Sequence, residues 1–415
     1  MARSIHFVCR GLTKLLPRGS GEPGLREMVL RICYFGTYRA NYSRNQIMVD
    51  GLRRSGAEVI ECHESLWWGI EDRVQAASGS WLRPAFIARV VRTYSKLLRT
   101  YRKVGDYDVM VLGYPGQLDV YLARILTWLR RRPLVLDVFM SLYLIASERG
   151  LVTQHPVTAR LIYWLEKLAC LLPDQLVLDT AEYVAWFQST YGISPDRFRL
   201  VPTGADDRVF EPVYRERVDD GLLHVVYYGT FIPNHGVEYI IDAANILADD
   251  DRIRFELIGQ GPDREKAVAL VRHYGLSNVT FVDWLGREEL VMRVARADVC
   301  LGSFGTTPQS TMTIQNKIYE GLAMGKPVVT GDAPTIRATL RHSEHVYLVE
   351  RANPGDLATA LLTLQSDPAL RERLAHQGRQ MFLREYSVGH IGERMQSHLA
   401  ELRSSRMESG SQVGC

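Results

Sequence analysis

The sequence predicts an α/β protein made of two doubly wound Rossmann-like domains that face each other across a cleft. Short apolar segments alternate with helical segments from one end of the chain to the other, which is the pattern of parallel sheets covered by helices. A polar, aperiodic segment at 211–221 divides this pattern into two similar halves and predicts an interdomain linker. At 415 residues, the chain is long enough to build a full core in each half.

We expect the first half, 28–210, to contain six strands with helices between them. Each candidate strand is short and apolar, as expected for strands buried on both faces of a sheet. The segments are 31–36, 58–61, 108–112, 134–138, 175–178 and 199–201. The preceding residues, 1–27, lack the apolar core and cleavage site of a signal peptide. We expect them to be a poorly ordered extension.

The second half, 222–385, repeats this scheme. Its candidate strands are 223–228, 254–258, 279–282, 299–301, 327–330 and 346–349. Ligands of doubly wound sheets bind outside the carboxyl ends of the strands, so two facing sheets place a site between the domains. The last residues, 403–415, predict a disordered tail.

The composition is that of a globular protein, with 46% hydrophobic and 23% charged residues. A net charge of +3 argues against nucleic acid as a partner, since such binding usually needs a concentrated basic excess. The six cysteines show no C-x-x-C pair and no metal-ligand spacing, which predicts reduced, buried thiols in a cytoplasmic protein. No apolar stretch is long enough to suggest a spanning helix.

The most informative segment is 316–329. Lys317 and Glu320 are three residues apart and therefore share a helix face. Gly325 ends this helix, and Pro327 opens an apolar strand. A cation and a carboxylate therefore lie together beside a sheet. Helix N-termini at such places hold phosphates, and a carboxylate further along the helix can accept hydrogen bonds from a ribose.

Other candidate site residues follow predicted strands, where glycine lets the backbone approach a ligand. They are Gly36 and Thr37 in the first half, and Gly229, Thr230, His235 and Gly259 in the second. Asp137 ends the strand at 134–138 and is a further candidate. Plainer interpretations stay open: an ordinary strand-to-helix turn at Gly36, a helix cap at His235, a turn cap at Asp137, and a surface ion pair between Glu320 and Lys317.

Five blocks of the second half, in this order, resemble family 4 retaining glycosyltransferases of the GT-B type. They are Tyr228-Gly229-Thr230, His235-Gly236, 257–261, 297–299, and the helix with Glu320 followed by Ala323, Gly325, Pro327 and Val328. The resemblance implies the GT-B fold, with an acceptor domain first and a nucleotide-sugar-binding domain second. It also implies that a helix at 386–402 packs back on the first domain.

The resemblance implies an enzyme of the EC 2.4 class, which moves a sugar from a nucleotide-diphosphate sugar to a glycan or lipid-linked acceptor. Surface polysaccharide or glycolipid synthesis is the expected setting. It assigns donor binding to Gly36, Thr37, Gly229, Thr230, Gly259, Asn316, Lys317 and Glu320, with Glu320 on the ribose. The catalytic candidates are Asp137, His235 and Lys317. The resemblance further implies that the acceptor attacks the front face of the sugar and that the leaving diphosphate helps to take the acceptor's proton.

The chain departs from the family pattern at three positions. Thr230 and His235 stand where members commonly carry Arg and Lys, and Met312 stands where the first of two glutamates is expected. We therefore expect His235, Lys317 and backbone amides of 313–316 to share the phosphates, and Asp137 to contact the sugar in place of a family histidine. No D-x-D pair stands among the candidate site residues to hold a divalent ion, which predicts that no metal and no cofactor are needed.

A basic amphipathic helix is predicted at 84–103. Arg89, Arg92, Lys96, Arg99 and Lys103 recur at spacings of three and four, and apolar residues recur on another face. Such helices rest on anionic lipid headgroups, which would make the protein peripheral on the inner face of the plasma membrane. Trp67, Trp68, Trp81 and Leu82 would lie at the same interface. A solvated basic face is the open alternative.

Two other functions fit the same fold. One is a nucleotide-sugar 2-epimerase, which needs no acceptor. The other is a degenerate, non-catalytic transferase homologue that serves as a partner subunit, since Thr230 and Met312 replace charged family residues.

Overall fold

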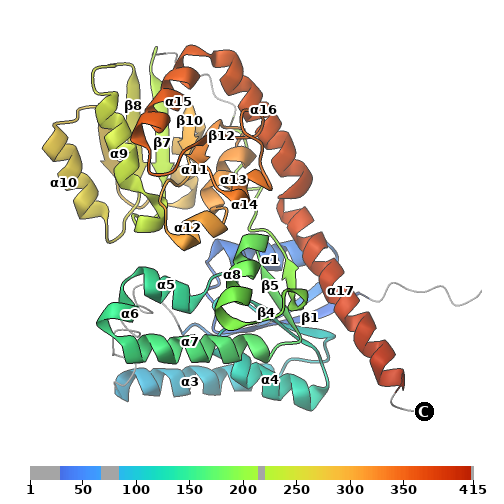
Figure 1. The fold of residues 1–415 in the computed structure, drawn as a ribbon. Coiled ribbons are helices and arrows are strands. Elements are labelled where there is room, and N and C mark those ends of the chain that lie inside the picture. The colour runs from blue at the N-terminus through green and yellow to red at the C-terminus, as the bar shows by residue number, and fades with distance from the viewer. Residues whose placement is uncertain (1–28, 67–83, 214–219, 413–415) are drawn as a thin grey trace, which may run out of the picture.

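The computed structural model describes residues 29–66, 84–213 and 220–412. Within these ranges the chain forms two parallel six-stranded sheets, each covered by helices on both faces (Figure 1). The strand orders are β2-β1-β3-β4-β5-β6 and β12-β11-β10-β7-β8-β9. The predicted α/β class with two doubly wound domains is confirmed. The predicted extension at 1–27, Trp67, Trp68, Trp81 and Leu82 lie outside the described residues.

All twelve predicted strands are present, with bounds within two residues of the prediction. The first sheet consists of β1 (Arg31–Gly36), β2 (Glu58–His63), β3 (Val109–Leu112), β4 (Leu134–Asp137), β5 (Gln175–Leu178) and β6 (Phe198–Leu200). The second consists of β7 (Leu223–Tyr228), β8 (Ile253–Ile258), β9 (Val279–Val282), β10 (Val299–Leu301), β11 (Val328–Gly331) and β12 (Tyr347–Val349).

The first sheet is covered by two layers of helices. One face packs against α1 (Ser43–Arg54) and α17 (Val388–Gln412). The opposite face packs against α3 (Pro84–Tyr101), α4 (Asp119–Arg130), α7 (Pro156–Leu171) and α8 (Ala181–Tyr191). Short helices α5 (Leu142–Glu148), α6 (Leu151–Gln154) and η2 (Pro195–Arg197) complete the domain.

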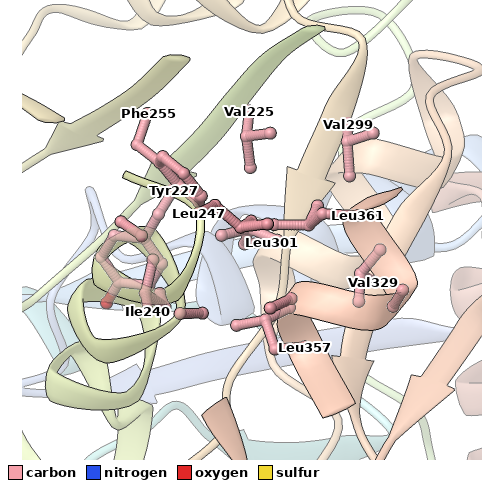
Figure 2. Packing of buried hydrophobic residues seen from close by; sticks show 14 of the residues in the cluster. Val225, Tyr227, Ile240, Leu247, Phe255, Val299, Leu301, Val329, Leu357 and Leu361 are labelled. Carbon is pink, nitrogen blue, oxygen red and sulfur yellow. The ribbon is translucent and has the colours of Figure 1, made fainter. Parts of the chain in front are cut away.

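The second sheet has its own core on each face. Alternate residues of β7, among them Val225 and Tyr227, pack with Ile240 and Leu361 on one face, as Figure 2 shows, because side chains of a strand point alternately to the two sides. The helices on this face are α9 (Val237–Ile246), α10 (Arg264–Tyr274) and α15 (Pro354–Ser366). The other face carries α11 (Arg287–Arg296), α13 (Asn316–Ala323), α14 (Pro334–Arg337) and α16 (Pro368–Glu385). Helices η3 (Pro233–His235) and α12 (Pro308–Met312) lie in the loops.

The last helix, α17, leaves the second domain after α16 and packs on α1 of the first (Figure 1). At its start, the Val388 amide donates to Asp207 Oδ1 at 3.1 Å, so the two places where the chain passes between the domains touch each other. The prediction of a disordered tail from residue 403 is wrong for residues 403–412, because α17 continues to Gln412. Ion pairs of Arg403 with Asp108 and of Arg406 with Asp174 attach this extension to the first domain.

Helices α1 and α17 cross at two glycines with no room for a side chain. A Cβ on Gly392 would lie 1.9 Å from the carbonyl oxygen of Gly51. We expect Gly392→Ala to lower the free energy of unfolding by about 1–3 kcal/mol, because overpacking forces the backbones apart. The matched control is Gly389→Ala in the same helix, whose Cβ would meet only Ser387 Oγ at 3.9 Å. Urea unfolding midpoints check the comparison, and equal midpoints for the two variants would contradict it.

Candidate functional site

Two glycine loops form the floor of the site at the carboxyl ends of β7 and β8. Gly229 and Gly259 have φ values of 142° and 136°, which disfavour other residues. A Cβ on Gly259 would lie 2.0 Å from the carbonyl oxygen of Gly229, so the two loops pack backbone against backbone. A Cβ on Gly229 would lie 2.8 Å from Lys317 Nζ. The glycine at 229 therefore leaves the space that the lysine fills.

Lys317 reaches this space from the first turn of α13. Its side chain is 6% exposed, and Nζ lies 4.1 Å from the centre of the Tyr227 ring, a cation–π contact. Nζ also lies 3.3 Å from His235 Nδ1. Burial lowers the pKa of Lys317 to about 7, because removal from water disfavours the ammonium form. An anion placed beside Nζ would favour the charged form.

His235 is held in the same cluster by its Nδ1 atom. Nδ1 lies 2.6 Å from the carbonyl oxygen of Thr230 and 2.9 Å from the Tyr227 hydroxyl. A carbonyl oxygen only accepts, so Nδ1 carries a proton and donates it to Thr230. Burial and the neighbouring Lys317 lower the pKa of His235 well below its usual value. The ring is therefore neutral, and Lys317 is the cation of this cluster.

Glu320 lies one turn further along α13. It is 9% exposed and shares a hydrogen bond with Tyr228. The Tyr228 hydroxyl is 3.2 Å from the Lys317 carbonyl oxygen, which is a second acceptor for its single proton. Burial raises the pKa of Glu320 to about 7, while the Tyr228 hydrogen bond and the charges of Lys317 and Arg287 oppose the rise. The structure thus brings together Gly229, Thr230, His235, Gly259, Lys317 and Glu320, with Asn316 at the start of α13.

The first domain contacts this part of the second through Glu148, at the end of α5. Its Oε1 accepts from the Gln309 amide at 2.8 Å, and its Oε2 accepts from Asn234 Nδ2 at 3.0 Å, next to His235 in the chain. Nearby, Met312 packs into the apolar cluster of the first domain, and its carbonyl oxygen accepts from Thr180 Oγ1 at 2.5 Å. A methionine at this position therefore serves the contact between the domains.

A second contact crosses between the domains near Glu320. Arg287 Nη2 donates to Gln46 Oε1 at 2.7 Å, and both residues line a cavity of about 380 Å³ with side chains from α1 and from 206–209. Sequence reasoning missed Glu148, Gln46 and Arg287. No motif marks them, because their partners lie far away in the chain.

Asp137 is buried in an ion pair inside the first domain, which favours a structural role, and its contact with a sugar stays a prediction. Its two oxygens accept from Arg44 Nε at 2.9 Å and Nη2 at 3.0 Å, and both side chains are fully buried. Arg44 Nη1 also donates to the carbonyl oxygens of Val201 and Pro202 at 2.8 and 2.7 Å. The pair joins α1 to the ends of β4 and β6 inside the first domain.

The Gly36-Thr37 loop is likewise engaged within the first domain, by Asp119, and its predicted donor contact stays a prediction. The Thr37 amide donates to Asp119 Oδ2 at 2.6 Å, and its hydroxyl donates to Oδ1 at 3.0 Å. A Cβ on Gly36 would lie 2.5 Å from the same carboxylate, so the glycine makes room for Asp119. Tyr94 from α3 donates to Asp119 as well, at 2.7 Å. Gly36 and Thr37 thus serve the packing of the first domain.

Comparisons with known proteins agree with the fold. Residues 223–367 match the family model described as "Glycosyl transferases group 1". The alpha-D-kanosaminyltransferase of Streptomyces kanamyceticus is 26% identical over 284 residues, 63% of this chain and 69% of that protein. The D-inositol 3-phosphate glycosyltransferase of Thermomonospora curvata is 27% identical over 225 residues, 49% of this chain and 51% of that protein. The chain therefore spans about half the length of the latter relative.

Solved structures share the architecture. Sucrose-phosphate synthase from Thermosynechococcus elongatus superposes with a TM-score of 0.68 at 17% identity, covering 91% of this chain and all of that one. Anabaena HepE in complex with UDP superposes with a TM-score of 0.63 at 15% identity, covering 90% and 100%. The fold is that of GT-B glycosyltransferases. More particularly, the family match and the relatives support a glycosyltransferase of group 1, an enzyme that transfers sugars; assignment to family 4 stays a prediction.

Within the described ranges, no helix combines the length and the apolar character needed to cross a bilayer. In the same ranges, His, Cys, Asp and Glu side chains form no group of three that could hold a metal ion. The prediction that no metal and no cofactor take part stays a prediction.

Proposed function

We propose that the chain is a retaining glycosyltransferase that moves a sugar from a nucleotide-diphosphate sugar to a glycan or lipid-linked acceptor. The observation that carries this proposal is the pair on α13. Lys317 and Glu320 lie buried on one helix, beside the glycine loops that end β7 and β8. The names of the relatives support sugar transfer, and the UDP bound to HepE supports a nucleotide donor.

In this proposal Lys317 is the main cation for the diphosphate. Its ammonium group bonds phosphate oxygens, assisted by backbone amides at the start of α13, where the helix dipole favours negative charge. His235, whose Nδ1 stays on the Thr230 carbonyl oxygen, holds its ring beside the lysine. Glu320 accepts hydrogen bonds from the ribose hydroxyls. These groups compensate for the arginine that Thr230 replaces.

The transfer breaks the bond between the anomeric carbon and the leaving phosphate oxygen. A new bond forms on the same face with the acceptor oxygen, whose proton passes to the departing diphosphate. The negative charge on the leaving group grows along this path, so a buried cation that is already in place stabilises the transition state. No protein nucleophile is required.

Donor affinity should depend on pH with a maximum near pH 7. An anionic donor favours protonated Lys317, so affinity is full below its pKa of about 7 and falls as the pH rises through that value. Ribose hydroxyls favour ionised Glu320, so affinity falls as the pH drops below its pKa of about 7. Calorimetric titration with a nucleotide-diphosphate sugar checks both limbs. Lys317→Met should abolish the fall in donor affinity above pH 7, and Glu320→Gln should abolish the fall below pH 7. If both variants keep the pH dependence of the parent, the assignment is contradicted.

The function is tested by product analysis after a thermal-shift screen of nucleotide-diphosphate sugars has identified a donor. We expect nucleoside diphosphate to appear faster when an acceptor is supplied, and the new glycosidic bond to keep the donor's anomeric configuration. Isomerisation of the donor without an acceptor would instead indicate a 2-epimerase. Donor binding without any turnover would indicate a non-catalytic partner subunit.

For the acceptor, we propose contact with an anionic membrane through 84–103, on the inner face of the plasma membrane. Arg92, Lys96 and Arg99 of α3 are exposed, while Leu97 and Tyr101 are buried against the sheet. The basic face is thus free to meet lipid headgroups.

A further inference from the structure

The outer surface of α7 carries a continuous apolar stripe. Its residues recur at spacings of four, three, four and three, which places them on one face of a helix. They are Val157, Leu161, Trp164, Leu168 and Leu171, with exposed fractions between 47% and 82%. In a helix of a globular protein such a stripe normally faces the core. Here it faces outward, while Ala169 and Cys170 on the opposite side of α7 pack against the sheet.

The neighbouring helices extend this stripe. Ile125, Trp128 and Leu129 of α4 are 57–71% exposed, and Ile87 and Val91 of α3 are 49% and 60% exposed. The Tyr121 hydroxyl of α4 donates to the Leu165 carbonyl oxygen of α7 at 2.7 Å, and Tyr94 of α3 donates to Asp119 of α4. The three helices are therefore neighbours. We call these ten side chains the apolar face.

The apolar face lies away from the donor site. Figure 1 shows α3, α4 and α7 on the side of the first domain that is turned away from the second. A broad surface that covers this face would therefore leave the space between the domains accessible. Exposed apolar residues gathered on three adjacent helices are more than scattered surface hydrophobics and indicate an interaction surface.

The charges on these helices identify the kind of surface. Only two carboxylates occur on α3, α4 and α7, Asp119 and Glu166, and both are fully buried. Glu166 is used inside the domain, where it accepts from Ser141 Oγ at 2.6 Å and from Tyr191 at 2.7 Å. The exposed charges of the three helices are thus all basic. They include Arg92, Lys96 and Arg99 on α3 and Arg160 on α7, while Lys167 Nζ lies 5.4 Å from the Trp164 ring.

We propose that the apolar face docks on an anionic lipid bilayer, with the α7 stripe at the boundary between headgroups and acyl chains and the basic side chains on lipid phosphates. Tryptophan, leucine and basic residues without acids are the composition of interfacial helices. A second copy of the chain fits less well, because a two-fold contact would set basic helices against each other. The proposal deepens the proposed function, and rests on it, in naming an anionic bilayer as the partner and this face as the surface that holds the enzyme there.

Sedimentation with vesicles tests this docking. At low salt we expect the full chain to pellet with vesicles of phosphatidylglycerol and phosphatidylcholine, and not with phosphatidylcholine alone. The variant Trp164→Ser/Leu168→Ser should bind at least about tenfold more weakly, because two large apolar side chains are lost from the interface. Arg160→Glu/Lys167→Glu should also weaken binding. The matched control, Trp284→Ser/Leu383→Ser, removes exposed residues of the second domain and should bind like the parent.

No pelleting with anionic vesicles, or equal pelleting of the Trp164→Ser/Leu168→Ser variant, would overturn the proposal. The proposal would also be overturned if the parent chain forms dimers in the absence of lipid and this variant is monomeric. The apolar face would then bind a second copy of the chain. Donor binding measured without vesicles separates this inference from the donor site. Lys317→Ala should lose donor binding and still pellet, whereas Trp164→Ser/Leu168→Ser should keep donor binding.

Discussion

Replacing Lys317 by alanine is expected to lower kcat/KM for sugar transfer by about 10²–10³-fold, the usual loss when a preorganised charge-stabilising group is removed from an active site. The loss should be large because Thr230 stands where an arginine is common, and Lys317 is the cation that lies against Gly229 and the Tyr227 ring. His235, held neutral by burial and by Lys317 itself, supplies no charge in the folded protein.

Steady-state release of nucleoside diphosphate measures this effect. Lys266→Ala is the matched control, since Lys266 belongs to the same domain but its side chain is 83% exposed. Removing it should leave kcat/KM within about twofold of the parent, because an exposed charge is screened by water and salt. Equal rates for the two lysine variants would remove Lys317 from the site.

Replacing Asp137 by alanine is expected to lower the free energy of unfolding by about 3–5 kcal/mol, the cost of leaving one partner of a buried ion pair without the other. Arg44 is fully buried, and its guanidinium loses both charge-assisted hydrogen bonds in this variant. The two carbonyl acceptors of Arg44 remain but cannot neutralise its charge.

Chemical unfolding of three variants checks this prediction. The variant Arg44→Met/Asp137→Leu should recover part of the loss, because apolar side chains of similar size need no partner. Arg252→Ala removes a pair in which the arginine side chain is 62% exposed, and should cost under about 1 kcal/mol. If Asp137→Ala unfolds at the same denaturant concentration as the parent but transfers sugar more slowly, the carboxylate has a chemical role after all.

Local sequence features were sufficient to predict both sheets. Each strand is a short apolar run between polar turns, and this signal does not depend on distant residues. The end of α17 could not be predicted in this way. Residues 403–412 have little apolar character, and the helix continues there beside ion pairs with Asp108 and Asp174, more than 200 residues earlier in the chain.

The same limit explains why some predicted site residues have structural partners that the sequence did not reveal. Lys317 and Glu320 were found because their relation is local, at one helical turn. Asp137 and Thr37 were assigned to a ligand because their partners, Arg44 and Asp119, are separated from them by 93 and 82 residues. The stripe on α7 shows the converse problem. Its spacing alone is that of a core helix, and only the structure shows that it lies on the outside.

The hydrogen bond between Val388 and Asp207 has a mechanical consequence. The chain passes between the domains twice, and both passages meet at this point. We expect them to act as one hinge, about which the lobes turn when the other contacts between the domains open. Because α17 is fixed along the first lobe, such a swing leaves its attachment in place, so the second lobe can admit a donor and close on it while the first keeps its position.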